Sequence, residues 1–216
     1  MSLEALFRAA VRELQERRVL FAVAGGLAAD LYRREPRLTM DVDVAIFTES
    51  HGKETAVSVV EALGLHAGIA RKADLAGRPL FTIRQRRTEP CMIIGRRKDK
   101  ETEEGVDILL PAVPWVKNAV DRAQGNLVDF GFGPVPALSL EDVILSKLYS
   151  LGASQLRAKD LDDLQSIFAV GHELDVPYLA GQMQRMELTI PKAARPLLPE
   201  TLLRLSRDVL RARRKL

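Results

Sequence analysis

The segment Asp41–Phe47 constrains the fold most strongly, because carboxylates and apolar side chains alternate along it. Residues two apart in a strand share one face, so the alternation predicts a strand with Asp41 and Asp43 on the same face, about 7 Å apart. The opposite face carries these apolar side chains: Met40, Val42, Val44 and Ile46. Two carboxylates that face one space repel each other, and the pKa of at least one rises. A divalent cation removes this conflict, and Mg²⁺ favours carboxylate, phosphate and water oxygens.

A third carboxylate, Asp107, lies in the apolar segment Val106–Leu110, which predicts another buried strand. An aspartate inside such a strand costs free energy unless it is paired or bound to a metal. Alternating acidic residues are also typical of an ordinary surface strand, in which they need no ligand. Here the flanking residues are too apolar for a solvated edge, and this favours a functional site.

The pair Gly25-Gly26 separates a predicted buried strand at 19–24 from a short helical segment at 28–34. Glycines at such a junction let the backbone approach a ligand closely, and the free amide groups at a helix start bind phosphate. The alternative is a turn that only needs positive φ. Arg37 and Thr39 lie between the glycines and the strand carboxylates, so the glycine turn and the carboxylates are expected on neighbouring strands.

Three charged residues fall on the apolar faces of predicted helices in the second half of the chain. Lys147 lies within the apolar stripe of the helix at 139–151. Arg157 and Asp160 lie within that of the helix at 157–170. A buried ammonium needs an anionic partner, so one interpretation is a salt bridge between Lys147 and Asp160. The other is a site in which Lys147 and Arg157 hold a triphosphate while Asp160 orients Lys147 or takes a proton from the acceptor. The two interpretations are compatible.

The pattern as a whole predicts an α+β protein, with a mixed sheet flanked by helices and followed by a helical domain. Helical and alternating spacings predict these further elements: helices at 2–17, 53–63, 115–123, 175–186 and 198–214, and strands at 78–84, 90–94 and 127–130. Gly131–Pro136 holds two glycines and two prolines, which is typical of a domain junction. We therefore expect an α/β domain at 1–133 and a helical domain with a basic last helix at 134–216. The site is expected in the cleft between them.

The net charge of +3 is distributed unevenly. Residues 71–100 carry ten Lys or Arg against three Asp or Glu, and residues 201–216 carry six against one. The two segments are therefore about +7 and +5, which leaves about −9 on the rest of the chain. Basic segments on an acidic chain indicate a polyanionic partner such as a nucleic acid, although solvated surface arginines explain the pattern equally well.

The chain has no feature of a membrane or secreted protein. No apolar run reaches the roughly 18 residues that a membrane span needs. Glu4 and Arg8 lie where a signal peptide has its apolar core, and the lone Cys91 cannot form an internal disulfide. We expect a cytoplasmic protein without a membrane partner, in which Cys91 is a small core residue.

Taken together, these residues resemble the DNA polymerase β-like nucleotidyltransferase superfamily. Within it the chain is most similar to the AbiEii-type nucleotidyltransferases, which include toxins of bacterial toxin–antitoxin systems. The resemblance covers roughly residues 15–170 and rests on these motifs: Gly25-Gly26, Arg37-x-Thr39-x-Asp41-Val42-Asp43, Asp107, Lys147 and Arg157-x-Lys159-Asp160-x-x-Asp163.

The resemblance implies an NTP substrate and a metal site at Asp41, Asp43 and Asp107 that holds two Mg²⁺ ions, with Mn²⁺ as a substitute. It also implies catalytic roles for these three aspartates, Lys147 and Asp160. The nucleotide-binding residues that it implies are Gly25, Gly26, Arg37, Thr39, Lys147 and Arg157. One position departs from the family: its members often place Ser or Thr after the glycines, where this chain has Leu27, which offers phosphate only a backbone amide.

We therefore expect a Mg²⁺-dependent enzyme that transfers an NMP from an NTP to an acceptor hydroxyl and releases pyrophosphate. The two basic segments favour RNA, in particular tRNA, as the acceptor, and a toxin of this kind would have an antitoxin partner. The alternatives are an aminoglycoside or a protein as acceptor, or a non-catalytic relative that binds nucleotide or nucleic acid. An aminoglycoside suits an acidic cleft. Leu27 favours the non-catalytic alternative, and the intact Asp41 and Asp43 pair argues against it.

Overall fold

The computed structural model describes residues 2–71, 89–97, 104–153 and 157–213. The first part of the chain forms α1 (Leu3–Glu16), β1 (Leu20–Val23), α2 (Gly25–Asp30), β2 (Asp41–Phe47), α3 (Gly52–Ala62), β3 (His66–Arg71), β4 (Pro90–Arg96), β5 (Gly105–Leu109), α5 (Val116–Ala123), β6 (Leu127–Asp129) and β7 (Pro134–Pro136). The rest forms α6 (Leu140–Ala153), α7 (Ala158–Val170), α8 (Val176–Arg185), the 3-10 helix η2 (Lys192–Leu197) and α9 (Glu200–Arg213). The strand predicted at 78–84 lies outside the described residues.

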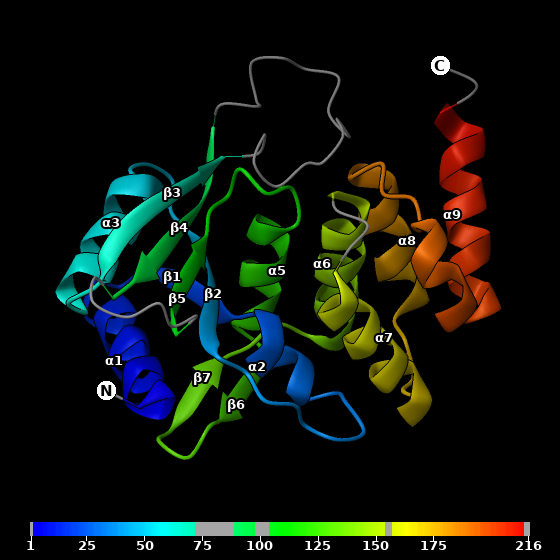
Figure 1. Cartoon of the computed structure of the whole chain (residues 1–216). Helices are drawn as coiled ribbons and strands as arrows, with labels where there is room; N and C mark the ends of the chain where they lie inside the picture. The colour runs from blue at the N-terminus through cyan, green and yellow to red at the C-terminus, as the bar shows by residue number, and fades with distance from the viewer. Residues whose placement is uncertain (1, 72–88, 98–103, 154–156, 214–216) are drawn as a thin grey trace.

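Five strands form a mixed sheet in the order β1-β2-β5-β4-β3 (Figure 1). β2 and β5 run parallel, and the other neighbouring strands run antiparallel. In the parallel pair, Asp43 lies directly opposite Asp107. The mixed sheet and its flanking helices confirm the predicted α+β fold class. The pairing also explains how Asp107 joins the carboxylates of β2, although more than sixty positions separate them in the sequence.

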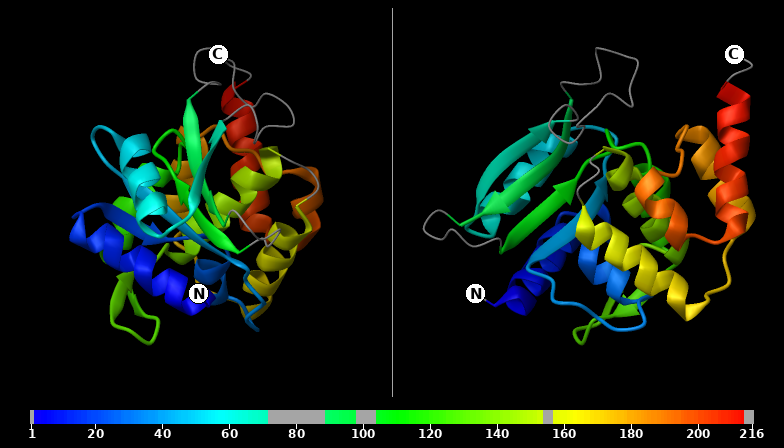
Figure 2. Two further views of the ribbon diagram at one scale, coloured as in Figure 1. Left: turned by 60° about the vertical axis from the view of Figure 1, so that its left-hand side comes forward. Right: turned by 45° about the vertical axis from the view of Figure 1, so that its right-hand side comes forward.

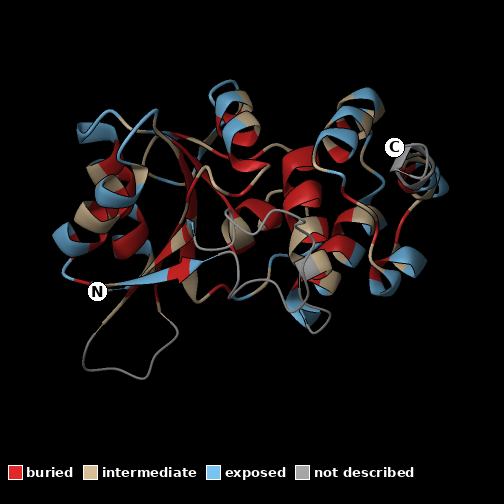
Figure 3. Cartoon of the chain, turned by 90° about the horizontal axis from the view of Figure 1, so that it is seen from above, coloured by how far each residue is buried: buried red, intermediate tan, exposed pale blue. Residues whose placement is uncertain are grey.

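Helices cover the two faces of the sheet differently. α1 and α3 pack on one face, where their apolar side chains share a core cluster with β2, β4 and β5. α5 packs on the other face, against β1 and β2. Asp41 and Asp43 point to the same face of β2 as Ala45, which packs in the core cluster around α5. We call this face of the sheet the pocket face. Figure 3 shows buried residues concentrated where the sheet and helices meet, and exposed residues on the outer helix surfaces.

The helical part of the chain is joined to the sheet by backbone and apolar contacts. The amide of Leu138 donates to the carbonyl of Val23 at the end of β1. One core cluster continues from β1 and β2 through α5 and α6 to α7, α8 and α9. These helices lie on the side of the molecule away from β3 (Figure 2). The domain boundary between 133 and 134 stays a prediction, and it adjoins β7, which pairs with β6.

Two local elements differ from the prediction. The sequence does not predict β3, because His66–Arg71 lacks alternating polarity and four of its six residues are exposed. This strand exists through its pairing with β4. The helix expected at 28–34 begins at Gly25 and ends at Asp30, because Gly25 turns the chain from strand to helix with a φ of +58°. None of the described helices is long and apolar enough to cross a membrane.

Candidate active site

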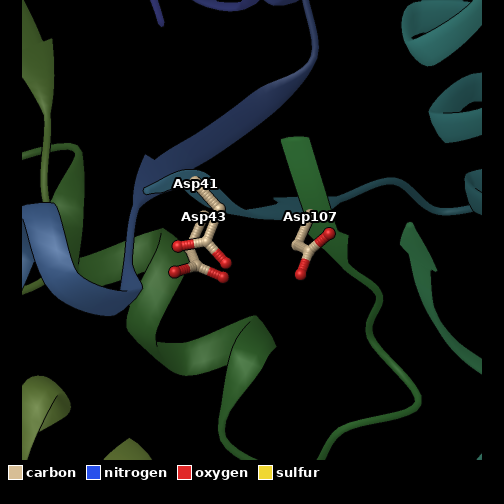
Figure 4. Close-up of side chains that lie close together, drawn as sticks. All are labelled: Asp41, Asp43 and Asp107. Carbon is tan, nitrogen blue, oxygen red and sulfur yellow. The ribbon is translucent and has the colours of Figure 1, made fainter. Parts of the chain in front are cut away.

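Three carboxylates lie side by side on the pocket face (Figure 4). Asp41 and Asp43 come from β2 and Asp107 from β5, and one oxygen of each lies within 4.8 Å of the others. Asp107 is buried, whereas Asp41 and Asp43 are half-buried. The in-register pairing of β2 and β5 produces this cluster, because paired residues on neighbouring strands point to the same face. The structure thus brings the predicted metal ligands together, and we call them the acidic cluster.

The electrostatics of the acidic cluster favour a bound cation. Burial raises the pKa of Asp43 to about 7, and the charges of Asp41 and Asp107 add to the effect. Burial also raises the pKa of Asp107, against the opposing effect of Arg96. A divalent cation relieves the repulsion that otherwise keeps a proton on the cluster. Because carboxylates are hard oxygen donors, this donor set fits Mg²⁺ or Mn²⁺ better than a cation that prefers sulfur or nitrogen.

The glycine pair brings the backbone directly beside the acidic cluster. A Cβ atom at Gly25 would overlap the carboxylate of Asp43. A Cβ atom at Gly26 would lie 2.7 Å from Oγ1 of Thr39 and 3.1 Å from Nη2 of Arg37. Gly25 also has positive φ, at +58°. Gly25 therefore has the positive φ that the turn needs, and both glycines leave room for the side chains of Asp43, Thr39 and Arg37. The close approach of this backbone to a ligand stays a prediction.

Lys147 of α6 is buried between two aspartates of α7. Its Nζ lies 3.0 Å from Oδ1 of Asp160 and 2.6 Å from Oδ2 of Asp163. Burial alone would lower the pKa of Lys147, but the two carboxylates outweigh burial and raise it. The salt bridge between Lys147 and Asp160 that the sequence indicates is therefore present. Arg157, the residue before α7, binds the other oxygen of Asp160 through Nε at 2.7 Å.

Asp163 is wholly buried and pairs with three cations. Besides Lys147, it binds Arg37 through Nε at 2.7 Å and Nη2 at 3.1 Å, and Arg33 through Nη1 at 2.7 Å. Burial would raise the pKa of Asp163, but Arg37 and Lys147 outweigh burial and lower it. Asp163 therefore ties α7 both to α6 and to the segment between α2 and β2, and it holds Arg37 and Lys147 in place.

These groups surround one pocket of about 230 Å³. The predicted site residues that line it are Gly25, Gly26, Arg37, Asp41, Asp43, Asp107, Lys147, Arg157 and Asp160. Thr39 is not in the lining, and its buried Oγ1 has no hydrogen-bond partner. Leu27 packs against the core cluster of α1 and α3 and does not line the pocket either. Much of the remaining wall is apolar and includes Met92, Leu109 and Trp115.

Two arginines beside the pocket escape prediction from the sequence. Arg33 pairs with Asp163, and Arg96 of β4 binds both oxygens of Asp107, at 2.5 and 3.1 Å. The first pair joins segments 130 positions apart, and the second depends on the pairing of β4 with β5, so neither follows from a local pattern. In the structure, alternating burial along β4 places Arg96 on the half-buried face with Met92.

A family model agrees with this geometry. The model described as nucleotidyl transferase AbiEii toxin, type IV TA system, matches residues 5–215. The chain belongs to the AbiEii family. The match confirms the resemblance carried by the motifs and extends it through the helical part of the chain. Among curated protein sequences, none matches this AbiEii chain significantly.

Several solved structures resemble this AbiEii chain at low sequence identity. An antigenic nucleotidyltransferase-like protein from Paracoccidioides brasiliensis is 15% identical, with a TM-score of 0.49 over 99% of this chain and 89% of that one. ANT(2″)-Ia, solved in complex with adenylyl-2″-tobramycin, is 18% identical, with a TM-score of 0.45 over 97% of each chain. JHP933 from Helicobacter pylori is 16% identical, with a TM-score of 0.42 over 98% of this chain and 90% of that one.

Membership of the AbiEii family identifies the protein as a nucleotidyltransferase of a toxin family. The expectation of an enzyme of this class is therefore confirmed. The family implies a nucleotide substrate and an antitoxin partner. The three aspartates form a cluster that can bind a metal ion, in agreement with that activity.

Proposed function

We propose that the protein is a Mg²⁺-dependent nucleotidyltransferase that moves an NMP from an NTP to a hydroxyl group of RNA, in particular tRNA, and releases pyrophosphate. One observation carries the proposal: the acidic cluster and two cations, Lys147 and Arg157, line the same pocket. Carboxylates suit the metal ions that bridge a triphosphate, and fixed cations suit its negative charge. Positioning and charge neutralisation supply most of the catalysis in phosphoryl transfer.

The three aspartates act together in this proposal. Asp41, Asp43 and Asp107 would together hold the two Mg²⁺ ions. Such ions stabilise the attacking and leaving oxygens of the displacement. Asp107 also helps to remove the proton from the attacking hydroxyl. The position of Asp107 supports this role, because its carboxylate lies in the same pocket as Asp41 and Asp43.

Lys147 and Arg157 bind the phosphates by exchanging partners. Both cations pair with Asp160, at 3.0 and 2.7 Å. A triphosphate competes with Asp160 because it offers more oxygens and more negative charge. Asp163 keeps Lys147 in position during the exchange, since that ion pair is separate. Asp160 is then free to orient Lys147 or to accept a proton.

The remaining predicted residues assist nucleotide binding. Arg37 lines the pocket while Asp163 holds its guanidinium, so it presents a positioned positive charge to the phosphates. The glycine pair lets the nucleotide approach the backbone. Thr39 contributes indirectly, because its side chain lies against Gly26.

The charges of the pocket favour RNA over an aminoglycoside as acceptor. An aminoglycoside is a polycation and needs unpaired carboxylates. Among the described residues, four carboxylates line the pocket, and three of them form the acidic cluster. The fourth, Asp160, already pairs with Lys147 and Arg157. Once a triphosphate has taken Lys147 and Arg157, Asp160 is the single carboxylate of the described lining that is open to a polycation, whereas an RNA strand needs none.

The basic segments add modest support for RNA. On α9, Arg204 and Arg207 are exposed and share Glu200, at 3.6 and 3.2 Å. Exposed ion pairs of this kind are weak, so both arginines remain available to phosphate. Most of the segment 71–100 lies outside the described residues. An antitoxin partner and a cytoplasmic location complete the proposal.

Incubation with each α-labelled NTP, Mg²⁺ and total tRNA tests the proposed function. We expect label on RNA with the wild type and none with Asp41→Asn, and the productive NTP identifies the nucleotide. Label on a polypeptide, or on an added aminoglycoside, would redirect the acceptor. NTP binding in a thermal-shift assay without any transfer would support the non-catalytic alternative.

A further inference from the structure

Strand β4 has two faces of different character. Ile93 and Gly95 are buried on the face that carries α3, and a Cβ atom at Gly95 would lie 2.9 Å from Cγ1 of Val60 in that helix. The other face carries half-buried residues, and we call three of them the β4 strip: Met92, Ile94 and Arg96. The β4 strip lies on the pocket face, because Ile94 is paired in register with Asp107.

On the pocket face, β4 makes no extensive contact with a described helix, although Met92 packs against the core cluster of α5 and α6. Among the described elements, β4 makes its main contacts with β3, β5 and α3, and α3 lies on the opposite face. α5 covers the pocket face only at β1 and β2. The strip is continuous with the pocket, because Met92 lines the pocket and pairs in register with Leu109, another lining residue.

The sheet order places the β4 strip on the side of the acidic cluster from which the acceptor hydroxyl would approach. The proposed phosphate-binding groups belong to α2, α6 and the start of α7, and α2 packs against β2, α6 and α7. From β2 the sheet continues through β5 to β4. In phosphoryl transfer the attacking and leaving oxygens lie roughly in line on opposite sides of the phosphorus. Because the pyrophosphate leaves beside Lys147 and Arg157, the attacking hydroxyl arrives from the side of β5 and β4.

We propose that the β4 strip binds the last nucleotides of a single-stranded RNA acceptor, an inference that rests on the proposed function. Met92 and Ile94 offer an apolar surface to the bases, and Arg96 offers a guanidinium to a phosphodiester. Strands β3 and β4 contain two arginines, one histidine and no acidic residue, so their charge is complementary to a polyanion. A single strand fits because its bases are free to lie on a protein surface, whereas a duplex keeps them stacked and paired.

Arg96 pairs with Asp107, which is a proposed metal ligand, and a cation bound to Asp107 weakens this ion pair. The guanidinium binds both oxygens of Asp107, at 2.5 and 3.1 Å. When Asp107 ligates a cation, its negative charge is shared and its attraction for Arg96 weakens. The Arg96 side chain is 32% exposed, so a phosphate can approach it from solvent. A phosphodiester then takes over the bidentate contact.

RNA binding measured by fluorescence anisotropy tests the β4 strip. The probe is a short fluorescein-labelled single-stranded RNA, with the matching duplex for comparison, in Mg²⁺ and without NTP so that no transfer occurs. We expect Arg96→Gln to weaken binding of the single strand about fivefold. It should also reduce the slope of log affinity against log salt by about 0.7, as for one lost phosphate contact on a single strand.

The apolar part of the β4 strip is tested with a second pair of variants. Ile94→Glu should weaken binding of the single strand about tenfold, because it removes the base contact and adds a negative charge. Ile94→Thr keeps a β-branched side chain in the strand and should weaken binding about threefold. The duplex should bind the wild type more weakly than the single strand does.

Matched controls come from exposed residues on other elements. Arg12→Gln removes a surface charge from α1, and Leu127→Glu replaces an exposed apolar residue on β6. Both should bind RNA within about twofold of the wild type, since surface changes outside a contact have small effects. RNA affinities of Arg96→Gln and both Ile94 variants equal to those of the controls would overturn the β4 strip, while label transfer to RNA by the wild type would leave the proposed function standing. A wild type that labels no RNA would overturn both.

Discussion

Gly25 lies so close to Asp43 that a Cβ atom at Gly25 would overlap the Asp43 carboxylate, and the backbone of Gly25 has a φ of +58°. Glycine is therefore needed at this position for two separate reasons. The contact ties the turn after β1 to a proposed metal ligand on β2. The geometry of the acidic cluster thus depends on a residue that has no side chain.

Replacement of Gly25 by alanine should damage the acidic cluster as well as the stability of the fold. Gly64 gives a matched control, because it has a φ of +71° and open space where a Cβ would lie. Gly64→Ala should therefore cost only the conformational strain, about 1–2 kcal/mol of unfolding free energy. Gly25→Ala adds the displacement of Asp43, so it should cost more in urea unfolding. It should also lower Mn²⁺ affinity in calorimetry by about tenfold or more. Equal effects of the two variants would contradict the close approach.

Asp163 should be essential for stability, while its neighbour Asp162 should not. Asp163 is wholly buried, and Asp163→Asn removes a buried charged partner from each of three cations, Arg33, Arg37 and Lys147. We expect a loss of about 3–5 kcal/mol in unfolding free energy, typical of a broken buried ion pair. Asp162 is 61% exposed and also pairs with Arg33, at 2.9 Å. Asp162→Asn should change stability by less than about 0.5 kcal/mol. Urea unfolding of both variants decides the matter, and similar losses would show that Asp163 is not the centre of this network.

Divalent-cation affinity should rise with pH until about pH 7 and then level off. Burial raises the pKa of Asp43 to about 7, so at lower pH a cation must displace a proton from this carboxyl. The affinity for Mn²⁺ should therefore fall about tenfold for each pH unit below 7. Calorimetric titrations in buffers of different ionisation enthalpy measure both the affinity and the proton released. Asp43→Asn should show a flatter profile, and a wild-type affinity independent of pH would contradict the assignment.

The same carboxyl should make the metal-free protein less stable as the pH rises. Because the pKa of Asp43 is higher in the folded state than its ordinary value of 3.8, the folded protein binds this proton more tightly. The contribution of Asp43 to stability is complete below pH 3.8 and is lost as the pH rises through about 7. Thermal unfolding in EDTA should show the Tm of the wild type falling relative to that of Asp43→Asn over this range. A difference between the two that stays constant with pH would count against the prediction.

The sequence predicts the parts of the fold that local patterns determine. The alternation of Asp41–Phe47 predicts β2, and helical spacing predicts α1 at nearly its observed bounds. The acidic cluster is also predictable, because an aspartate such as Asp107 inside an apolar strand requires a partner. Lys147 is predictable in the same way, as a charge on the apolar side of a helix.

Contacts between distant segments are not predictable from local patterns. Arg37 and Asp163 are 126 positions apart, and nothing in either segment encodes their pairing. The contact between Arg96 and Asp107 follows only from the adjacency of β4 and β5. β3 escapes prediction for a related reason, since its pairing with β4 forms the strand and its own residues are mostly exposed.

The rate of NMP transfer to RNA by Asp43→Asn, relative to the wild type, tests the central claim most directly. Asp162→Asn is the matched control, because it removes the same charge from an exposed aspartate. Single-turnover assays with labelled NTP, Mg²⁺ and tRNA should show a loss of about 10³-fold or more for Asp43→Asn and an unchanged rate for Asp162→Asn. Transfer by Asp43→Asn at the rate of the wild type would contradict the assignment of the acidic cluster as the catalytic metal site.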